Sequence, residues 1–299
     1  MMYVGIVSEL LGILKDIAVS LLASLVWAIG GFLAVFFFNK INRWYYKRKF
    51  YKATRLDIDK KANSFSIQCF IANSGKYDGD EKVYLGYPFE YMAAATINTY
   101  LNMLSDNIDM GTNPCPLQVN TIAKIDKATD LILLGGPFHN ILTKLFFGLN
   151  KDNTNVPFYF DTFEGEEATL FYKENGAKEF KTAKPKKDPI GHYYCEDYAL
   201  IMNIKNQYKP TKRIISIMGC RSIGVLGGTL AFTSLNKEML KNIEYDEYAV
   251  IIRCFGEQNN ISNERPIELV TTIKLDSINI DNLIEIKDRQ EKIIQEKSC

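Results

Sequence analysis

Residues 17–38 read IAVSLLASLVWAIGGFLAVFFF, twenty-two positions without a charged side chain. At about 1.5 Å of rise per residue, a helix of this length extends roughly 33 Å, enough to cross the ~30 Å hydrocarbon core of a bilayer. A buried core helix is the alternative interpretation, but uncharged runs of this length are typical of membrane spans. The sequence therefore predicts one transmembrane helix.

The segment that follows, residues 39–55, reads NKINRWYYKRKFYKATR and contains seven Lys or Arg residues and no acid. Basic flanks favour the cytoplasmic side, whereas the stretch before the span offers only Lys15 against Glu9 and Asp16. A secretory signal peptide has its basic residues before the apolar run and a cleavage site after it. We therefore expect a retained single-pass anchor in the cell membrane, with its N-terminus outside, its body in the cytoplasm, and lipid contacts from the basic segment.

Composition narrows the classes of partner. The chain has 36 basic and 35 acidic residues, and since residues 39–55 are strongly basic, the body that follows is net acidic. That balance argues against a nucleic acid polymer as partner. The six cysteines show no CxxC spacing, as expected of a reduced cytosolic protein. After the N-terminal segment and span (1–38), residues 56–280 suit one large domain, and residues 281–299 are predicted to form a charged C-terminal helix or tail.

Within the body, short β-rich runs alternate with helical patterns. This order predicts an α/β domain of Rossmann-like organisation, with a mostly parallel sheet, crossover helices and an antiparallel C-terminal edge. The expected strands cover residues 65–72, 82–87, 130–134, 157–160, 168–172, 197–204, 213–218, 248–255 and 266–275. The expected helices cover residues 89–104, 138–149 and 223–236, and a long loop is expected over residues 173–191.

Three expected strands end in glycine immediately before an expected helix. Free N–H groups at a helix start, together with the positive end of the helix dipole, bind anions. The first turn contains Gly86, and Glu90 follows in the first turn of the next helix. Glu90 is interpreted as a carboxylate that complements the helix dipole or, alternatively, as a ribose-hydroxyl acceptor or catalytic carboxylate.

The second turn contains Gly135 and Gly136 after a purely aliphatic strand, with His139 and Asn140 just beyond. Open α/β sheets bind ligands at the carboxyl ends of such strands. Asn140 is suited to a base or a ribose, and His139 to a phosphate. A solvent-facing role is the alternative for His139.

The third turn combines Gly219, Arg221, Ser222, Gly224 and Thr229. Small residues beside an arginine and two hydroxyl groups predict a phosphate cradle. The sequence contains neither a G-x-x-x-x-G-K-[ST] motif nor a strict G-x-G-x-x-G motif. Neither a P-loop NTPase nor a standard dinucleotide-binding fingerprint is therefore indicated.

Four segments together resemble a group of poorly characterised prokaryotic Rossmann-like proteins with a GGP-x-x-N turn. They are GYPFEYMAA (86–94), DLILLGGPFHN (130–140), DYALI (197–201) and GCRSIGVLGGT (219–229). The pattern is also similar to the SLOG-type nucleotide sensors of bacterial defence systems, and the Y-L-x-x-P-F segment resembles nucleoside deoxyribosyltransferases. These resemblances imply a nucleotide or nucleoside ligand, and no cofactor or metal is assigned.

One main functional hypothesis and two alternatives follow. The main hypothesis is a single-span, cytoplasm-facing sensor or effector that binds a nucleotide-derived small molecule and changes its self-association on binding. The first alternative is an enzyme, a nucleoside or nucleotide N-glycosidase or transferase with Glu90 at the reacting centre. The second alternative is a structural module that recruits partners through residues 281–299.

Overall fold

The fold was analysed in a computed structural model of the chain. The residues that it describes are 2–56, 65–71, 76–78, 81–83, 88–104, 108–114, 129–137, 139–147, 157–161, 169–173, 177–181, 186–187, 193–234, 245–257, 260–261 and 267–275. The chain divides into two units, Met1–Arg48 and Lys49–Cys299. The predicted helix over residues 281–299 and the turn at Gly86 lie outside the described residues.

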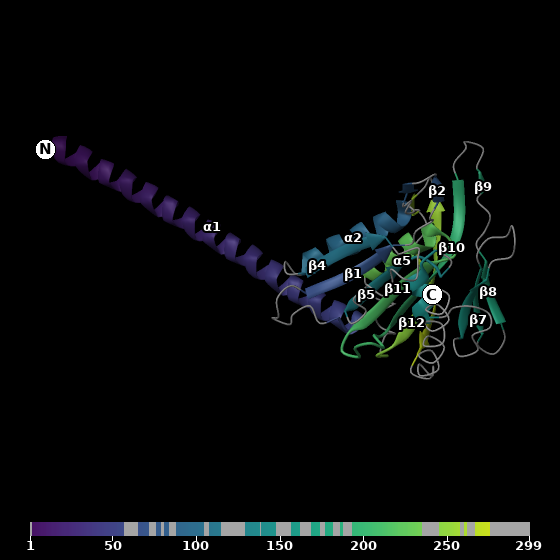
Figure 1. Cartoon of the computed structure of the whole chain (residues 1–299). Coiled ribbons are helices and arrows are strands. Elements are labelled where there is room, and N and C mark those ends of the chain that lie inside the picture. Colours follow the sequence, from purple (N-terminus) through teal and green to yellow (C-terminus); the bar gives the residue numbers. More distant parts are fainter. Residues whose placement is uncertain are drawn as a thin grey trace. The chain divides into compact units, whose positions relative to one another are not determined.

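The predicted span lies in helix α1 (Met2–Thr54), which is drawn in purple and blue in Figure 1. The part Leu14–Thr54 is long and apolar enough to cross a membrane. Between Leu14 and Tyr46 the large apolar side chains are exposed, and Trp27 reaches 82%. Water is an unfavourable environment for so much apolar surface, which a bilayer would cover. The orientation of the span stays a prediction.

The last turn of α1 belongs to the second unit, which begins at Lys49 rather than at residue 56. Phe50, Ala53 and Leu56 are buried in the core of this unit. The helix ends because Arg55 takes a left-handed conformation (φ 58°), and its N–H donates to Tyr51 O over 2.7 Å, the geometry of an αL cap. Phe50 thus packs inside the body, although residues 39–55 were expected at the membrane surface.

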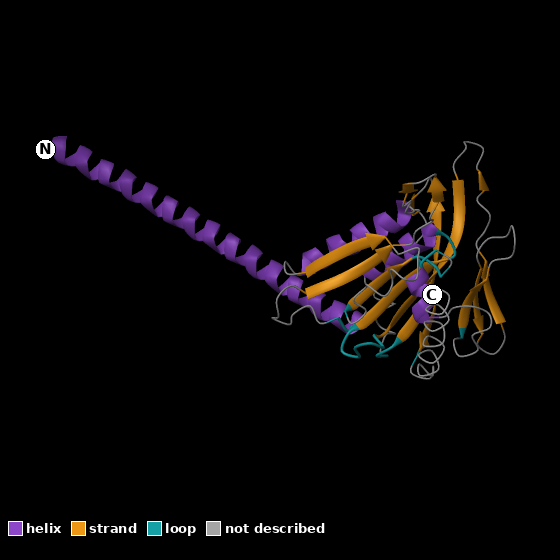
Figure 2. Cartoon of the chain, viewed as in Figure 1, coloured by secondary structure: helices purple, strands orange, loops and turns teal. Residues whose placement is uncertain are grey.

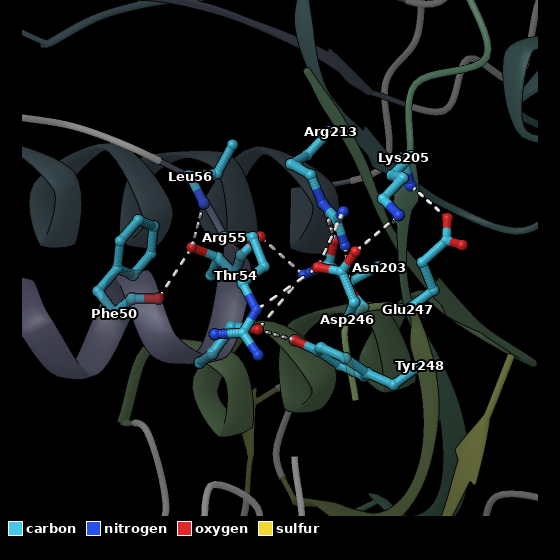
Figure 3. A network of polar contacts seen from close by, with 11 residues as sticks. Phe50, Thr54, Arg55, Leu56, Asn203, Lys205, Arg213, Asp246, Glu247 and Tyr248 are labelled. Atoms are coloured by element: carbon cyan, nitrogen blue, oxygen red, sulfur yellow. Dashed lines mark hydrogen bonds and ion pairs between the residues drawn. The ribbon is translucent and has the colours of Figure 1, made fainter. Parts of the chain in front are cut away.

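Polar side chains of the sheet donate hydrogen bonds to the carbonyl groups at this helix end (Figure 3). Asn203 donates from Nδ2 to Thr54 O over 2.9 Å and to Ala53 O over 3.3 Å. Tyr248 donates from its hydroxyl to Ala53 O over 2.7 Å, and Arg213 donates from Nε to Asn203 Oδ1 over 3.0 Å. We call these three side chains the Asn203 cluster. They supply partners for carbonyls that a helix C-terminus otherwise leaves unpaired.

In the body, the described strands form one nine-stranded sheet, a two-stranded hairpin and a three-stranded sheet (Figures 1 and 2). The main sheet contains β1 (Phe65–Ile71), β4 (Ile108–Pro114), β5 (Asp130–Leu134), β9 (Lys186–Lys187), β10 (Tyr193–Lys205), β11 (Arg213–Gly219), β12 (Tyr248–Glu257), β13 (Asn260–Ile261) and β14 (Glu268–Lys274). The hairpin is β2 (Lys76–Asp78) with β3 (Glu81–Val83), and the small sheet is β6 (Phe158–Asp161), β7 (Thr169–Lys173) and β8 (Ala177–Lys181). The helices are α2 (Pro88–Leu104), α4 (Ile141–Phe147) and α5 (Ser222–Ser234).

The main sheet is mixed. Its order is β13-β12-β10-β11-β5-β1-β4, and β14 also pairs with β12. The strands β4, β1, β5 and β11 are parallel, whereas β10, β12, β13 and β14 pair antiparallel. The predicted α/β class and the antiparallel edge made by the last strands are confirmed. The antiparallel part is larger than expected, since it includes β10.

Side chains alternate between the two faces of this sheet, as the period of two in a strand requires. On one face the odd-numbered residues of β10, such as Ala199 and Ile201, pack with α2, α5 and the last turn of α1. On the other face Leu200 and Met202 pack with α4 and with apolar side chains of β6 and β7. Two separate apolar cores result, one on each side of the sheet.

Two predictions of local structure were wrong. Residues 173–191 were expected to be one loop, but the described part contains β8 and β9. Strand β4, with sequence IDMGTNP, was not expected, because glycine, asparagine and proline are depleted in strands. Among the described strands it pairs with β1 alone, and an edge position tolerates these residues.

Candidate functional site

The candidate site lies where the parallel strands β5 and β11 end. Their pairing places the second and third glycine turns side by side. Gly135 has φ 106°, a conformation that favours glycine, and its N–H donates to Ile217 O over 3.0 Å. A Cβ atom at Gly136 would lie 3.3 Å from Gly219 O. The structure therefore brings together two of the three turns that the sequence singled out.

Asn140 has an intramolecular role at this edge. Its side chain is fully buried, and its Nδ2 donates to Leu134 O over 3.0 Å and to Phe70 O over 3.2 Å. Its Oδ1 accepts from the N–H groups of Leu142 and Thr143, and so caps the start of α4. The amide that was expected to contact a base or a ribose is thus engaged with β1, β5 and α4.

Asn140 lies at the point of the sheet where its topology predicts a ligand. Strand β1 has β4 on one side and β5 on the other, so the direction of chain progression reverses between β1 and β5. Open α/β sheets commonly bind ligands in the crevice at such a reversal. In this protein the Asn140 side chain bridges the two strand ends there. The neighbouring turn after β11 is therefore the better candidate for groups that bind a ligand.

The third turn surrounds a side chain that the sequence analysis did not select. Asp197 of β10 is fully buried, and its Oδ2 accepts from Gly224 N over 2.6 Å and from Arg221 N over 3.0 Å. Its Oδ1 accepts from Tyr198 N over 2.8 Å. Backbone N–H groups at the start of α5, predicted to hold a phosphate, thus hold an internal carboxyl group.

The glycines of this turn make room for that arrangement. A Cβ atom at Gly224 would lie 2.6 Å from Asp197 Oδ2 and 2.8 Å from Tyr198 O. A Cβ atom at Gly219 would overlap backbone atoms of Arg221 and Val225. Both positions therefore exclude any larger residue, and the requirement comes from the packing of β10 and α5 themselves.

Glu90 is the second acidic side chain near this turn. It lies in the first turn of α2, is only 3% exposed, and its Oε2 makes no hydrogen bond within the part of the chain that the structure describes. Burial raises its pKa to about 8, against an opposing hydrogen bond from its own backbone. At pH 7 the Glu90 carboxyl is therefore mostly protonated.

Glu90 and Asp197 influence one another. Burial raises the pKa of Asp197 well above its usual range, backbone hydrogen bonds from Tyr198, Gly224 and Arg221 oppose that rise, and the charge of Glu90 adds to it. Three backbone donors stabilise the ionised form of Asp197, whereas among the described residues Glu90 has its own backbone donor alone. We call Glu90, Asp197 and the N–H groups of Arg221 and Gly224 the Asp197 cluster.

The other predicted residues lie in the turn after β5 or in and just before α5. His139 is exposed, and partial desolvation lowers the pKa of its imidazole. Arg221 and Ser222 are half-buried, and burial lowers the pKa of the Arg221 guanidinium. Thr229 lies two turns into α5, is fully buried, and its Oγ1 has no hydrogen-bond partner among the described residues. Thr229 and Glu90 thus place two unpaired polar atoms on α5 and α2, which pack against each other.

Sequence periodicity contains a signal for both acids. Asp197 precedes Ala199 and Ile201 at a spacing of two, so it shares the core-facing side of β10. Glu90 continues the buried stripe Ala93, Ala94 and Ile97 of α2. A charged residue at a core position is the unusual feature that identifies each of them.

The described residues hold no group of three or more His, Cys, Asp or Glu side chains arranged to bind a metal ion. No protein-family model matches the chain, and no curated protein matches it. The Asp197 cluster is therefore the feature of the described residues that points to a function.

Proposed function

We propose that this protein is a membrane-anchored, cytoplasm-facing sensor or effector whose Rossmann-like body binds a nucleotide-derived small molecule beside the Asp197 cluster. The observation that carries the proposal is the unpaired, buried Oε2 of Glu90 near Asp197. An unpaired buried carboxyl oxygen costs about 1–3 kcal/mol, and a bound donor would remove that cost. The resemblance to SLOG-type nucleotide sensors supports the same class of ligand.

The remaining elements of the site supply the other expected contacts. The turn at Gly135 and Gly136 would let a ligand approach the backbone, and the half-buried Arg221 and the exposed His139 would contribute cationic or hydrogen-bonding groups. Ligand binding would act on self-association of the anchored chains through a difference in affinity for two arrangements. The basic residues that precede this unit, within residues 39–48, would hold the body near anionic lipid headgroups.

The test begins with the full chain purified in detergent. Small molecules released on denaturation are identified by mass spectrometry, and isothermal titration then measures binding of a panel of mononucleotides, cyclic nucleotides and oligonucleotides. We expect heat with at least one member and at least tenfold weaker binding to Glu90→Met. Absence of heat with every member, together with no co-purifying nucleotide or nucleoside, would contradict the proposal.

A second candidate is favoured by the raised pKa of Glu90. A carboxyl group with a pKa of about 8 holds a proton at neutral pH and is suited to general acid catalysis. In an N-glycosidase, Glu90 would protonate the leaving base as the C1′–N bond breaks. Water would then add to C1′ and return a proton to the carboxylate, which restores the acid.

Chromatography distinguishes the two functions. The full chain is incubated with nucleosides and nucleotides, and the mixture is analysed for free base. A sensor leaves every ligand intact, whereas the enzyme releases base with the wild-type chain and not with Glu90→Gln. If the chain neither binds nor cleaves any member, the remaining hypothesis is the structural module.

A further inference from the structure

The Asp197 cluster carries information about which part of the ligand it contacts. The N–H groups of Arg221 and Gly224 both donate to Asp197 Oδ2, over 3.0 Å and 2.6 Å. A helix start binds phosphate through such free N–H groups. Here they already have an acceptor, and Gly224 is the residue that lets the acceptor approach. A phosphate would have to displace a fully buried side chain to reach them.

Charge opposes phosphate as well. Asp197 and Glu90 are close enough for the charge of Glu90 to act on the ionisation of Asp197. A phosphate dianion beside this buried pair would have to lose its hydration, which costs free energy unless a cation or free hydrogen-bond donors compensate for it. The sequence predicted a phosphate cradle here, but in the structure the backbone donors of this turn bind the carboxyl group of Asp197.

The unpaired atoms point to a different chemistry. Glu90 Oε2 and Thr229 Oγ1 are buried polar atoms that have no partner among the described residues. A protonated carboxyl group both donates and accepts a hydrogen bond, and a threonine hydroxyl does the same. An uncharged group with hydroxyls, which also donate and accept, is complementary to such atoms and adds no charge.

We propose, on the basis of the function proposed above, that the Asp197 cluster recognises an uncharged, hydroxyl-bearing part of the ligand, of the kind a ribose presents, through Glu90. The same arrangement excludes the ligand's phosphate from the start of α5. The preferred ligand of this site is therefore a nucleoside rather than its phosphorylated form.

Matched pairs of ligands test this inference on the full chain in detergent. Isothermal titration compares adenosine, guanosine, cytidine and uridine with their 5′-monophosphates and with inorganic phosphate. We expect at least one nucleoside to bind with a Kd equal to or below that of its monophosphate, and phosphate not to compete with it. A monophosphate that binds at least tenfold more tightly than its nucleoside, or competition by inorganic phosphate, would overturn the inference and leave the proposed function intact. Failure of every nucleoside and nucleotide to bind would overturn both.

Two substitutions assign the effect to the cluster. Glu90→Met should weaken nucleoside binding at least tenfold, since both the donor and the acceptor of this carboxyl are lost, whereas Glu268→Met, the same change on an exposed side chain of β14, should not alter it. Asp197→Ala removes the internal acceptor, so inorganic phosphate should then bind. Unchanged nucleoside affinity in Glu90→Met would overturn the inference. If Asp197→Ala does not fold, the ligand pairs on the wild-type chain still decide.

Discussion

Two buried polar clusters lie on the same face of the same strand, and they differ in how completely their groups are paired. Asp197 and Asn203 of β10 are six residues apart, or ~20 Å at the rise of a strand. In the Asn203 cluster the amide donates to two helix carbonyls and accepts from Arg213 (Figure 3). In the Asp197 cluster the neighbouring Glu90 keeps an unpaired oxygen.

This difference indicates that the Asn203 cluster has a structural role and that the Asp197 cluster is the candidate functional site. The Asn203 cluster solves a problem that the fold creates, because a helix that ends inside a core leaves carbonyl groups without partners. The Asp197 cluster brings two acids together in the core, which the fold alone does not require and which costs stability. Sites where local rules are broken without compensation are commonly functional sites. Four predictions separate the two clusters by the size and the sign of their effects on stability.

The largest effect is expected from removing the last turn of α1. A chain beginning at residue 56 lacks Phe50 and Ala53, and it leaves Asn203 and Tyr248 without their carbonyl partners. Loss of a buried phenylalanine costs about 3–5 kcal/mol, and unpaired buried groups add about 1–3 kcal/mol each. These losses approach the whole stability of a domain, about 5–15 kcal/mol. We expect no cooperative unfolding by circular dichroism, whereas the chain from Lys49 should melt cooperatively. Equal melting temperatures would show that the Asn203 cluster is dispensable.

The next effect is expected for Asn203→Ala. This change removes bonds to Ala53 O and Thr54 O and leaves Arg213 Nε without its acceptor. We expect a loss of about 4 kcal/mol in the free energy of unfolding, from two or three buried groups left unpaired. Urea unfolding of the chain from Lys49 measures it. The control Asn102→Ala, on the exposed surface of α2, should cost less than about 0.5 kcal/mol.

Glu90→Gln should have the opposite sign and stabilise the protein. The pKa of Glu90 rises from 4.5 to about 8 on folding, so the folded state holds the proton more tightly than the unfolded state. Below pH 4.5 both states are protonated and the substitution gains nothing. The gain grows as pH rises toward 8 and then levels, because each unit between the two pKa values is worth about 1.4 kcal/mol.

Urea unfolding of wild type and Glu90→Gln at pH 4, 5, 6, 7 and 8 tests this prediction. We expect a gain of about 2–3 kcal/mol at pH 7 after allowing for the unpaired amide that glutamine introduces. A gain that does not depend on pH would show that the carboxyl is not protonated in the folded state. A loss of stability at pH 7 would mean that Glu90, like Asn203, stabilises the fold.

The sequence predicted the features that depend on neighbouring residues. The uncharged run of 17–38, the aliphatic strands β5 and β11 and the glycine turns after them follow from local pattern, and the structure contains all of them. Glu90 was singled out because it follows a glycine turn at a helix start. Its position on the buried stripe of α2 gives that choice a physical reason.

The sequence did not predict what fills the site, because the contacts are long-range. Asp197 reaches Arg221 and Gly224 across 24 and 27 residues, and Asn140 reaches Phe70 across 70. The Asn203 contact with the end of α1 spans 150 residues. Local pattern showed that backbone donors are present at a turn, but only the pairing of β10 with β11 shows which side chain they bind.

The smallest effect is expected where the Asn203 cluster meets solvent. Lys205 Nζ lies 2.8 Å from Asp246 Oδ2, but the two side chains are 50% and 46% exposed. Water and salt screen such a pair, so Lys205→Met should change the free energy of unfolding by less than about 0.5 kcal/mol, and by nothing measurable in 1 M NaCl. Arg213, which is 5% exposed and also binds Asn203, is the matched contrast: Arg213→Met should cost several-fold more. Equal losses from the two substitutions would mean that the ion pairs of Asp246, rather than the buried amide of Asn203, hold the end of α1.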